Sequence, residues 1–211
     1  MSDGTAAALS IARSELILGG QKSGKSRRAE ALARAWVDAS PAHRAVFVAT
    51  GQAWDDEMRE RIARHQRERA VRVPGMQTVE APCDVAGALA RHSAPQTLVV
   101  VDCLTLWLTQ WLMPLPAPGE EAAQACGAQH AEAFESQCRD FLQAVRQTAG
   151  PVVIVGNEIG LGVIPLGREV RAFVDALGVL NQRTAEACER VTLVAAGLPL
   201  TLKKEAWPWR S

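Results

Sequence analysis

Residues 19–26 read GGQKSGKS, and their types and spacing are those of a phosphate-binding loop. Gly19 and the triplet Gly24-Lys25-Ser26 fit the pattern GxxxxGK[ST], in which backbone N–H groups and a helix N-terminus surround phosphate oxygens. In such a loop Lys25 reaches the outer phosphates of a nucleotide, and the Ser26 hydroxyl binds Mg²⁺. The predicted nucleotide-binding residues here are Gly19, Gly20, Gln21, Lys22, Ser23, Gly24, Lys25 and Ser26.

Asp102 ends the apolar run 98–101. Enzymes with such a loop usually supply a carboxylate from the end of a neighbouring strand, so we predict that Asp102, together with Ser26, organises Mg²⁺ or its waters. Alternatively, Asp102 caps a helix that begins at Leu104. The two roles are compatible.

His65 lies within a segment, 55–69, that we predict to be a helix, because Asp can cap its start and its acidic first turn and basic last turn match the helix dipole. Its spacing places His65 on one stripe with Met58, Ile62 and Arg69, the inward-facing side of the helix. A histidine on such a stripe is more often a core residue than a catalyst, so periodicity leaves both interpretations open.

Short apolar runs alternate with helical patterns along the chain. The runs expected to be strands are 15–19, 45–50, 97–102, 152–157, 191–195 and 200–203, and the helical patterns lie near 24–38, 55–69, 83–92, 120–148 and 168–188. The runs are apolar throughout, as strands covered on both faces should be. The sequence therefore predicts an α/β fold with a mostly parallel central sheet flanked by helices and a C-terminal hairpin-like strand.

Composition limits the class of protein. A chain of 211 residues, 48% hydrophobic and 22% charged, can form one domain, which we place at 14–211 after a loose extension at 1–13. The net charge is zero, so nucleic acid and anionic membranes are not expected partners. No apolar run is long enough to span a membrane, and none of the five cysteines is in a CxxC pair, which favours a cytoplasmic protein with reduced thiols.

Several blocks of the sequence, in order, resemble the bifunctional adenosylcobinamide kinase and adenosylcobinamide-phosphate guanylyltransferase family of cobalamin biosynthesis. The blocks read GGQKSGKSRRAE, VFVATGQAWDDEMRERIARHQRER, VDCLTLWLT, VGNEIGLGVIPLGREVRAFVDALGVLNQRTAE and GLPLTLK. The resemblance extends from about residue 15 to 204. It implies a P-loop NTPase fold of the RecA-like kind and a homo-oligomer, as a trimer or another ring.

The resemblance also implies roles for individual residues. In that family the histidine of the RIxxH motif becomes covalently guanylylated, which here is His65, facing inward and shielded from water. The substrates implied are GTP, ATP, adenosylcobinamide and adenosylcobinamide phosphate. Residues that match the family's guanine-nucleotide contacts are Ala49, Thr50, Gly51, Gln66, Arg67, Glu68, Arg69, Glu80 and Asp102.

Some features stay open. Asn157 and Glu158 precede a glycine-rich loop that could contact the corrinoid or a neighbouring subunit, or could be a structural turn, and Asn181 could pack or cap a helix. Another small-molecule P-loop kinase would share Lys25, Ser26 and Asp102 but would leave His65 without a purpose. A regulatory GTPase would need an NKxD motif, which the sequence lacks.

Overall fold

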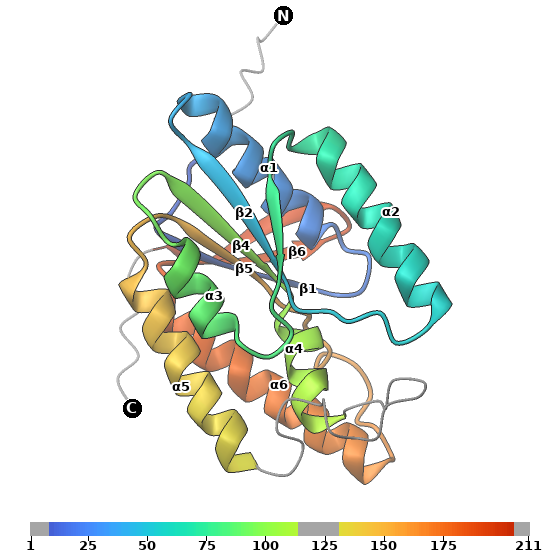
Figure 1. Ribbon diagram of the computed structural model, residues 1–211. Helices are drawn as coiled ribbons and strands as arrows, with labels where there is room; N and C mark the ends of the chain where they lie inside the picture. Colours follow the sequence, from blue (N-terminus) through green and yellow to red (C-terminus); the bar gives the residue numbers. More distant parts are fainter. Residues whose placement is uncertain (1–8, 114–130, 205–211) are drawn as a thin grey trace, which may run out of the picture.

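The computed structural model describes residues 9–113 and 131–204, and a sheet in the order β3-β2-β4-β5-β1-β6-β7 forms its centre (Figure 1). The strands are β1 (Ser14–Gly19), β2 (Arg44–Ala49), β3 (Gln77–Glu80), β4 (Thr97–Asp102), β5 (Val152–Val155), β6 (Arg190–Ala195) and β7 (Leu198–Lys204). The helices are α1 (Lys25–Ala39), α2 (Asp56–Arg72), α3 (Val85–His92), α4 (Leu104–Leu112), α5 (Ala131–Gln147) and α6 (Arg168–Ala187).

All strand pairs are parallel except β6 with β7. The turn between these two strands holds Ala196 and Gly197 with positive φ, 51° and 79°, as tight antiparallel hairpins require. The predicted P-loop α/β fold, its parallel sheet and its hairpin-like last strand are thus confirmed.

Helices cover both faces of the sheet (Figure 1). Because successive side chains of a strand point to opposite faces, Leu16 and Leu18 pack in one cluster with residues of α3, α4, α5 and α6, whereas Ile17 packs in the other with α1. Both clusters are buried, which is why the strands are apolar throughout. Because helices cover both faces of the sheet, the loops that carry the sequence motifs lie at the carboxyl ends of the strands.

Two elements were not among the predicted ones. β3 is a short edge strand in which only Val79 is partly buried, so it has no apolar run to reveal it. α4 follows β4 directly, and the sequence suggested it only as the alternative that Asp102 caps. The predicted helix at 120–148 is observed as α5 from residue 131, and its first part lies outside the described residues.

Three of the cysteines, Cys103, Cys138 and Cys188, are buried and free, as expected for reduced thiols. Cys83 is disulfide-bonded, so that expectation is wrong for this residue, because spacing alone does not show which cysteines a fold brings together. Among the helices within 9–113 and 131–204, none combines the length and apolar character needed to cross a membrane.

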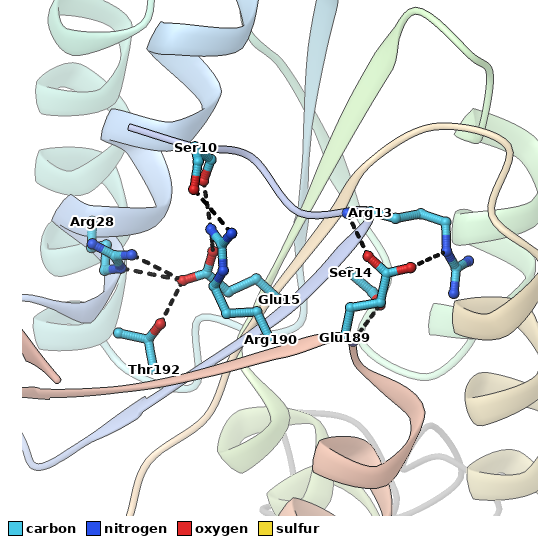
Figure 2. A network of polar contacts seen from close by, with 8 residues as sticks. All are labelled: Ser10, Arg13, Ser14, Glu15, Arg28, Glu189, Arg190 and Thr192. Carbon is cyan, nitrogen blue, oxygen red and sulfur yellow. Dashed lines mark hydrogen bonds and ion pairs between the residues drawn. The ribbon is translucent and has the colours of Figure 1, made fainter. Parts of the chain in front are cut away.

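A buried carboxylate ties the amino end of β1 to its neighbours (Figure 2). Glu15 is 1% exposed and accepts hydrogen bonds from Arg28 of α1 at 3.1 Å and from Thr192 of β6 at 2.7 Å, and Arg190 adds a second ion pair at 3.4 Å. Arg190 also bonds to Ser10. The sequence predicts a loose extension at residues 1–13. The described part of this segment, residues 9–13, is instead held against the sheet.

Next to this carboxylate, Arg13 forms an ion pair with Glu189 at 3.0 Å, and the Glu189 amide donates to the Ser14 hydroxyl (Figure 2). These contacts join the start of β1 to the start of β6. Together with Glu15 they fix β1 at the end opposite to the loop that joins β1 to α1.

Replacing Glu15 with Ala should lower the free energy of unfolding by about 3–5 kcal/mol, because Arg28 and Arg190 would be left partly buried without their partner. Urea denaturation measures this difference. As a control, Asp38→Ala removes the exposed pair with Arg34 and should cost less than about 1 kcal/mol. Equal costs for the two variants would contradict a structural role for Glu15.

Candidate nucleotide-binding and catalytic site

The loop between β1 and α1 has a backbone that glycine makes possible. A Cβ atom at Gly19 would lie 2.3 Å from the carbonyl oxygen of Val194 and 2.6 Å from the Ser23 hydroxyl. Gly24, the N-cap of α1, has a φ of 105°, which L side chains rarely adopt. The loop therefore has the tight, left-handed turns that phosphate-binding loops need before the N-terminus of a helix.

Neighbouring strand ends hold this loop in place. The Glu158 amide donates to the Gly19 carbonyl at 3.0 Å, and the Gly197 amide donates to the Ser23 carbonyl at 2.9 Å. Asn181, buried in α6, donates from its side chain to the Asn157 carbonyl at 3.0 Å. The open question about Asn157, Glu158 and Asn181 is thus answered in part. Glu158 bonds to the loop, and Asn181 holds the neighbouring Asn157 in place.

Lys25 is buried at the start of α1. Its Nζ atom lies 2.5 Å from the Gly20 carbonyl oxygen and 3.5 Å from the Ser23 hydroxyl, so the side chain folds back along the loop. Burial lowers the pKa of Lys25, while the nearby Cys103 and Asp102 act in the opposite direction. An amino group with few partners at the loop's centre is suited to bind phosphate oxygens.

Asp102 is the point on which the site converges. Burial raises the pKa of its carboxyl group, and the effects that oppose this are a hydrogen bond from Ser26 and then the charges of His65, Lys25 and Arg69. Two predicted site residues of α1 and two of α2 therefore act electrostatically on one carboxylate at the end of β4. The Ser26 hydroxyl beside a partly buried carboxylate is also a donor set that suits Mg²⁺.

The alternative role of Asp102 as a helix cap is wrong. The N-cap residue of α4 is Cys103, and no side chain caps this helix. The Asp102 carboxylate instead faces the start of α1.

Three strand ends lie side by side at the same edge. In the register of the sheet, Ala49 of β2 is paired with Asp102 of β4 and with Glu80 of β3. Thr50 follows at once, and its buried hydroxyl donates to the Cys103 carbonyl at 2.8 Å and accepts from the Cys103 amide at 2.7 Å. Its side chain thus joins two strand ends. At Gly51, an added Cβ would lie 2.9 Å from Leu106, so a larger residue would crowd α4.

His65 is exposed on α2, so the prediction that it is shielded from water is wrong in this chain. Met58 and Ile62, on the same stripe, are only partly buried. The predicted stripe was right in one respect, since Arg69 is buried on it and the charge of His65 acts on Asp102.

The other predicted residues of α2 lie at the surface of the protein. Gln66, Arg67 and Glu68 are exposed, and Glu68 forms an ion pair with Arg72 at 2.9 Å. The predicted cap of this helix is correct: Asp55 accepts a hydrogen bond from the Met58 amide at 2.7 Å.

Two contributors were not predicted from the sequence. Glu30, buried in α1, accepts a hydrogen bond from Arg72 at 2.7 Å, and the Thr105 hydroxyl of α4 accepts one from the Asn157 amide at 3.1 Å. No sequence motif marks Glu30, a charged residue within α1. Its only signal in the sequence is its place among the inward positions of a helix that otherwise buries apolar residues.

Comparison with known proteins gives consistent results. The profile of a family described as "Cobinamide kinase / cobinamide phosphate guanyltransferase" matches residues 15–202. The bifunctional adenosylcobalamin biosynthesis protein CobP of Pseudomonas aeruginosa is 41% identical over 194 residues, which cover 90% of this chain and 98% of that protein. The bifunctional proteins CobU of Salmonella typhimurium and Escherichia coli are each 31% identical, over 89% of this chain and 98% of their own length.

The raised pKa of Asp102 predicts how its removal changes stability with pH. The folded protein binds this proton more tightly than the unfolded chain, so wild-type stability falls as the pH rises from the ordinary Asp range through the raised pKa. Asp102→Asn cannot ionise and escapes this loss. Without nucleotide and metal, the variant should unfold at higher denaturant concentration than wild type near neutral pH, with the difference shrinking toward about pH 4. A difference independent of pH would contradict the assignment.

Proposed function

The chain belongs to the cobinamide kinase / cobinamide phosphate guanyltransferase family, and we propose that it catalyses both reactions at one nucleotide site. The first reaction phosphorylates adenosylcobinamide on its aminopropanol hydroxyl, and the second transfers GMP from GTP to adenosylcobinamide phosphate. The observation that carries the proposal is the loop between β1 and α1, with Gly24 at a φ of 105° and the buried Lys25 amino group 2.5 Å from the Gly20 carbonyl, in a chain that matches the family over residues 15–202.

In the kinase step the hydroxyl oxygen of adenosylcobinamide bonds to the γ-phosphorus of ATP or GTP. The bond from that phosphorus to the bridging oxygen breaks, ADP or GDP leaves, and the proton of the hydroxyl passes to water. Such a transfer depends on positioning and on neutralisation of charge. Lys25 and the N–H groups of the loop supply both.

Mg²⁺ is part of the proposal. The Ser26 hydroxyl and the Asp102 carboxylate would hold it, and the ion when bound would neutralise charge on the nucleotide's outer phosphates. Burial of Asp102, which raises its pKa, leaves a carboxylate whose ionised form gains from a cation.

In the guanylyl transfer an unprotonated ring nitrogen of His65 attacks the α-phosphorus of GTP, and pyrophosphate leaves. A phosphate oxygen of adenosylcobinamide phosphate then attacks the same phosphorus and releases the histidine, giving adenosylcobinamide-GDP. Lys25 stabilises the charge that grows on pyrophosphate in the first of these steps. The exposure of His65 suits a nucleophile that must meet GTP and then a large corrinoid.

We also propose a homo-oligomer in the cytoplasm, where ATP and GTP are available. Support for assembly comes from apolar side chains that this chain leaves exposed on the loop before α6 and on β7. They include Leu161 at 81%, Val163 at 97%, Leu166 at 98% and Leu198 at 72% exposure. A second chain could cover them.

The two reactions should separate in a His65→Ala variant. With adenosylcobinamide and nucleotide, this variant should form adenosylcobinamide phosphate at close to the wild-type rate, because the kinase step does not use the histidine. Formation of adenosylcobinamide-GDP should fall by about 1,000-fold or more, as removing a covalent nucleophile does. Chromatography of the corrinoid products measures both.

The matched control is His92→Ala, at the end of α3 and outside the site, which should retain both reactions. Adenosylcobinamide-GDP formed at the wild-type rate by His65→Ala would refute the covalent route. A wild-type protein that phosphorylates small alcohols but never transfers GMP would support the alternative of a plain P-loop kinase.

A further inference from the structure

The helix that carries His65 is attached to the rest of the chain through its last turns. Of the residues of α2, Arg69 is the buried one, and the C-cap residue Val73 is 1% exposed. The charged remainder of the helix lies at the surface beside α1 (Figure 1). A helix with so little apolar contact depends on polar contacts for its position.

Arg69 docks α2 on the edge of the sheet. Its guanidinium carbon lies 3.6 Å from the centre of the Phe47 ring in β2, and its Nη2 atom donates to the Thr78 hydroxyl of β3 at 3.1 Å. A planar guanidinium can stack on a ring and donate sideways at the same time, which an ammonium cannot. This one side chain therefore fixes the helix against two strands.

Arg72 docks the same end of α2 on α1. It donates to Glu30 at 2.7 Å, and the Glu30 side chain is 5% exposed, so the pair is well shielded on one side. Glu30 lies on the helix that begins at Lys25, one and a half turns further on. The pair thus links the helix of the phosphate-binding loop directly to the helix of the histidine.

His65 lies four residues before Arg69, so the two share a face of α2. Any rotation or shift of the docked end is transmitted along the helix to the histidine. A displacement of about 1 Å between a nucleophile and its target can cost about 100-fold in rate. The distance from His65 to the nucleotide's α-phosphorus is therefore set by contacts made one and two turns away.

We propose that Arg69, through its contacts with Phe47 and Thr78, and the Arg72–Glu30 pair are positioning residues for guanylyl transfer, and that phosphoryl transfer does not need these contacts. This rests on the proposed function. The selectivity follows because the sheet holds α1 and β4, which carry Lys25, Ser26 and Asp102, whereas these contacts hold α2. It also gives Arg69 a role other than the nucleotide contact that the resemblance implies. The charge of Arg69 also acts on Asp102, so the variants that keep this charge decide the selectivity.

The test compares Arg69→Met, Thr78→Val and Glu30→Gln with wild type. The first keeps an apolar contact with Phe47 but loses the charge and the donor, the second removes one acceptor without changing charge, and the third removes the partner charge of Arg72. Transfer of label from [α-³²P]GTP to the protein in a single turnover measures guanylylation. Transfer of label from the γ-phosphate to adenosylcobinamide measures the kinase step.

We expect guanylylation at saturating GTP to slow by about 10- to 100-fold in Arg69→Met and by less in the other two, with the GTP concentration for half-maximal rate unchanged. In Thr78→Val and Glu30→Gln, which keep the charge of Arg69, the kinase rate should stay within about threefold of wild type. Thr78→Ser, which keeps the hydroxyl, should restore guanylylation. The matched control is Arg59→Met on the first turn of α2, whose exposed pair with Asp56 lies away from the dock, and both of its rates should be those of wild type.

Other outcomes overturn the proposal. A weaker affinity for GTP in both reactions of Arg69→Met would make Arg69 a nucleotide contact. An equal fall in both rates of Thr78→Val, with a lower melting temperature, would make the contact between Arg69 and Thr78 purely structural. If Arg69→Met does not fold, the comparison of Thr78→Val with Thr78→Ser tests the proposal. Equal rates of guanylylation in these two variants would refute a positioning role for the contact between Arg69 and Thr78. A wild-type protein that takes no label from [α-³²P]GTP would instead refute the proposed function.

Discussion

The partly buried carboxylate of Asp102 is the constraint on which the site depends. Burial raises its pKa, and the groups that offset this are Ser26, His65, Lys25 and Arg69. A charge taken out of water is stable only among such partners, so the end of β4 draws together α1 and α2, two helices distant in the sequence. The carboxyl ends of parallel strands meet at one edge, and this edge is where open α/β sheets place their ligands.

The same arrangement explains how one loop can serve two reactions. In the proposed mechanism, Lys25 and the loop amides neutralise the outer phosphates, whether the γ-phosphoryl group is transferred or pyrophosphate leaves. What differs between the two proposed reactions is the nucleophile: a hydroxyl of the substrate in one case and His65 in the other. The chemistry then turns on where α2 holds its histidine, because the charge-handling groups are common to both steps.

Much of this could be predicted from the sequence, and the exceptions have physical causes. The buried strands and the phosphate-binding loop have strong local signals, and Asp102 ends an apolar run in a way that indicates its role. The sequence did not predict β3, because an exposed edge strand needs no apolar pattern. The exposure of His65 could not be predicted, because a helical stripe indicates which residues share a face but not whether the chain covers it. The Glu30–Arg72 contact depends on how two helices pack, which no local pattern encodes.

The most direct test of the account is to locate the covalent intermediate. The protein would be incubated with Mg²⁺ and [α-³²P]GTP, digested under alkaline conditions that preserve phosphorus–nitrogen bonds, and its labelled peptide sequenced by mass spectrometry. The account predicts a single GMP adduct that is labile to acid and located on His65. An adduct on another residue, or transfer of GMP to adenosylcobinamide phosphate without any protein adduct, would contradict it.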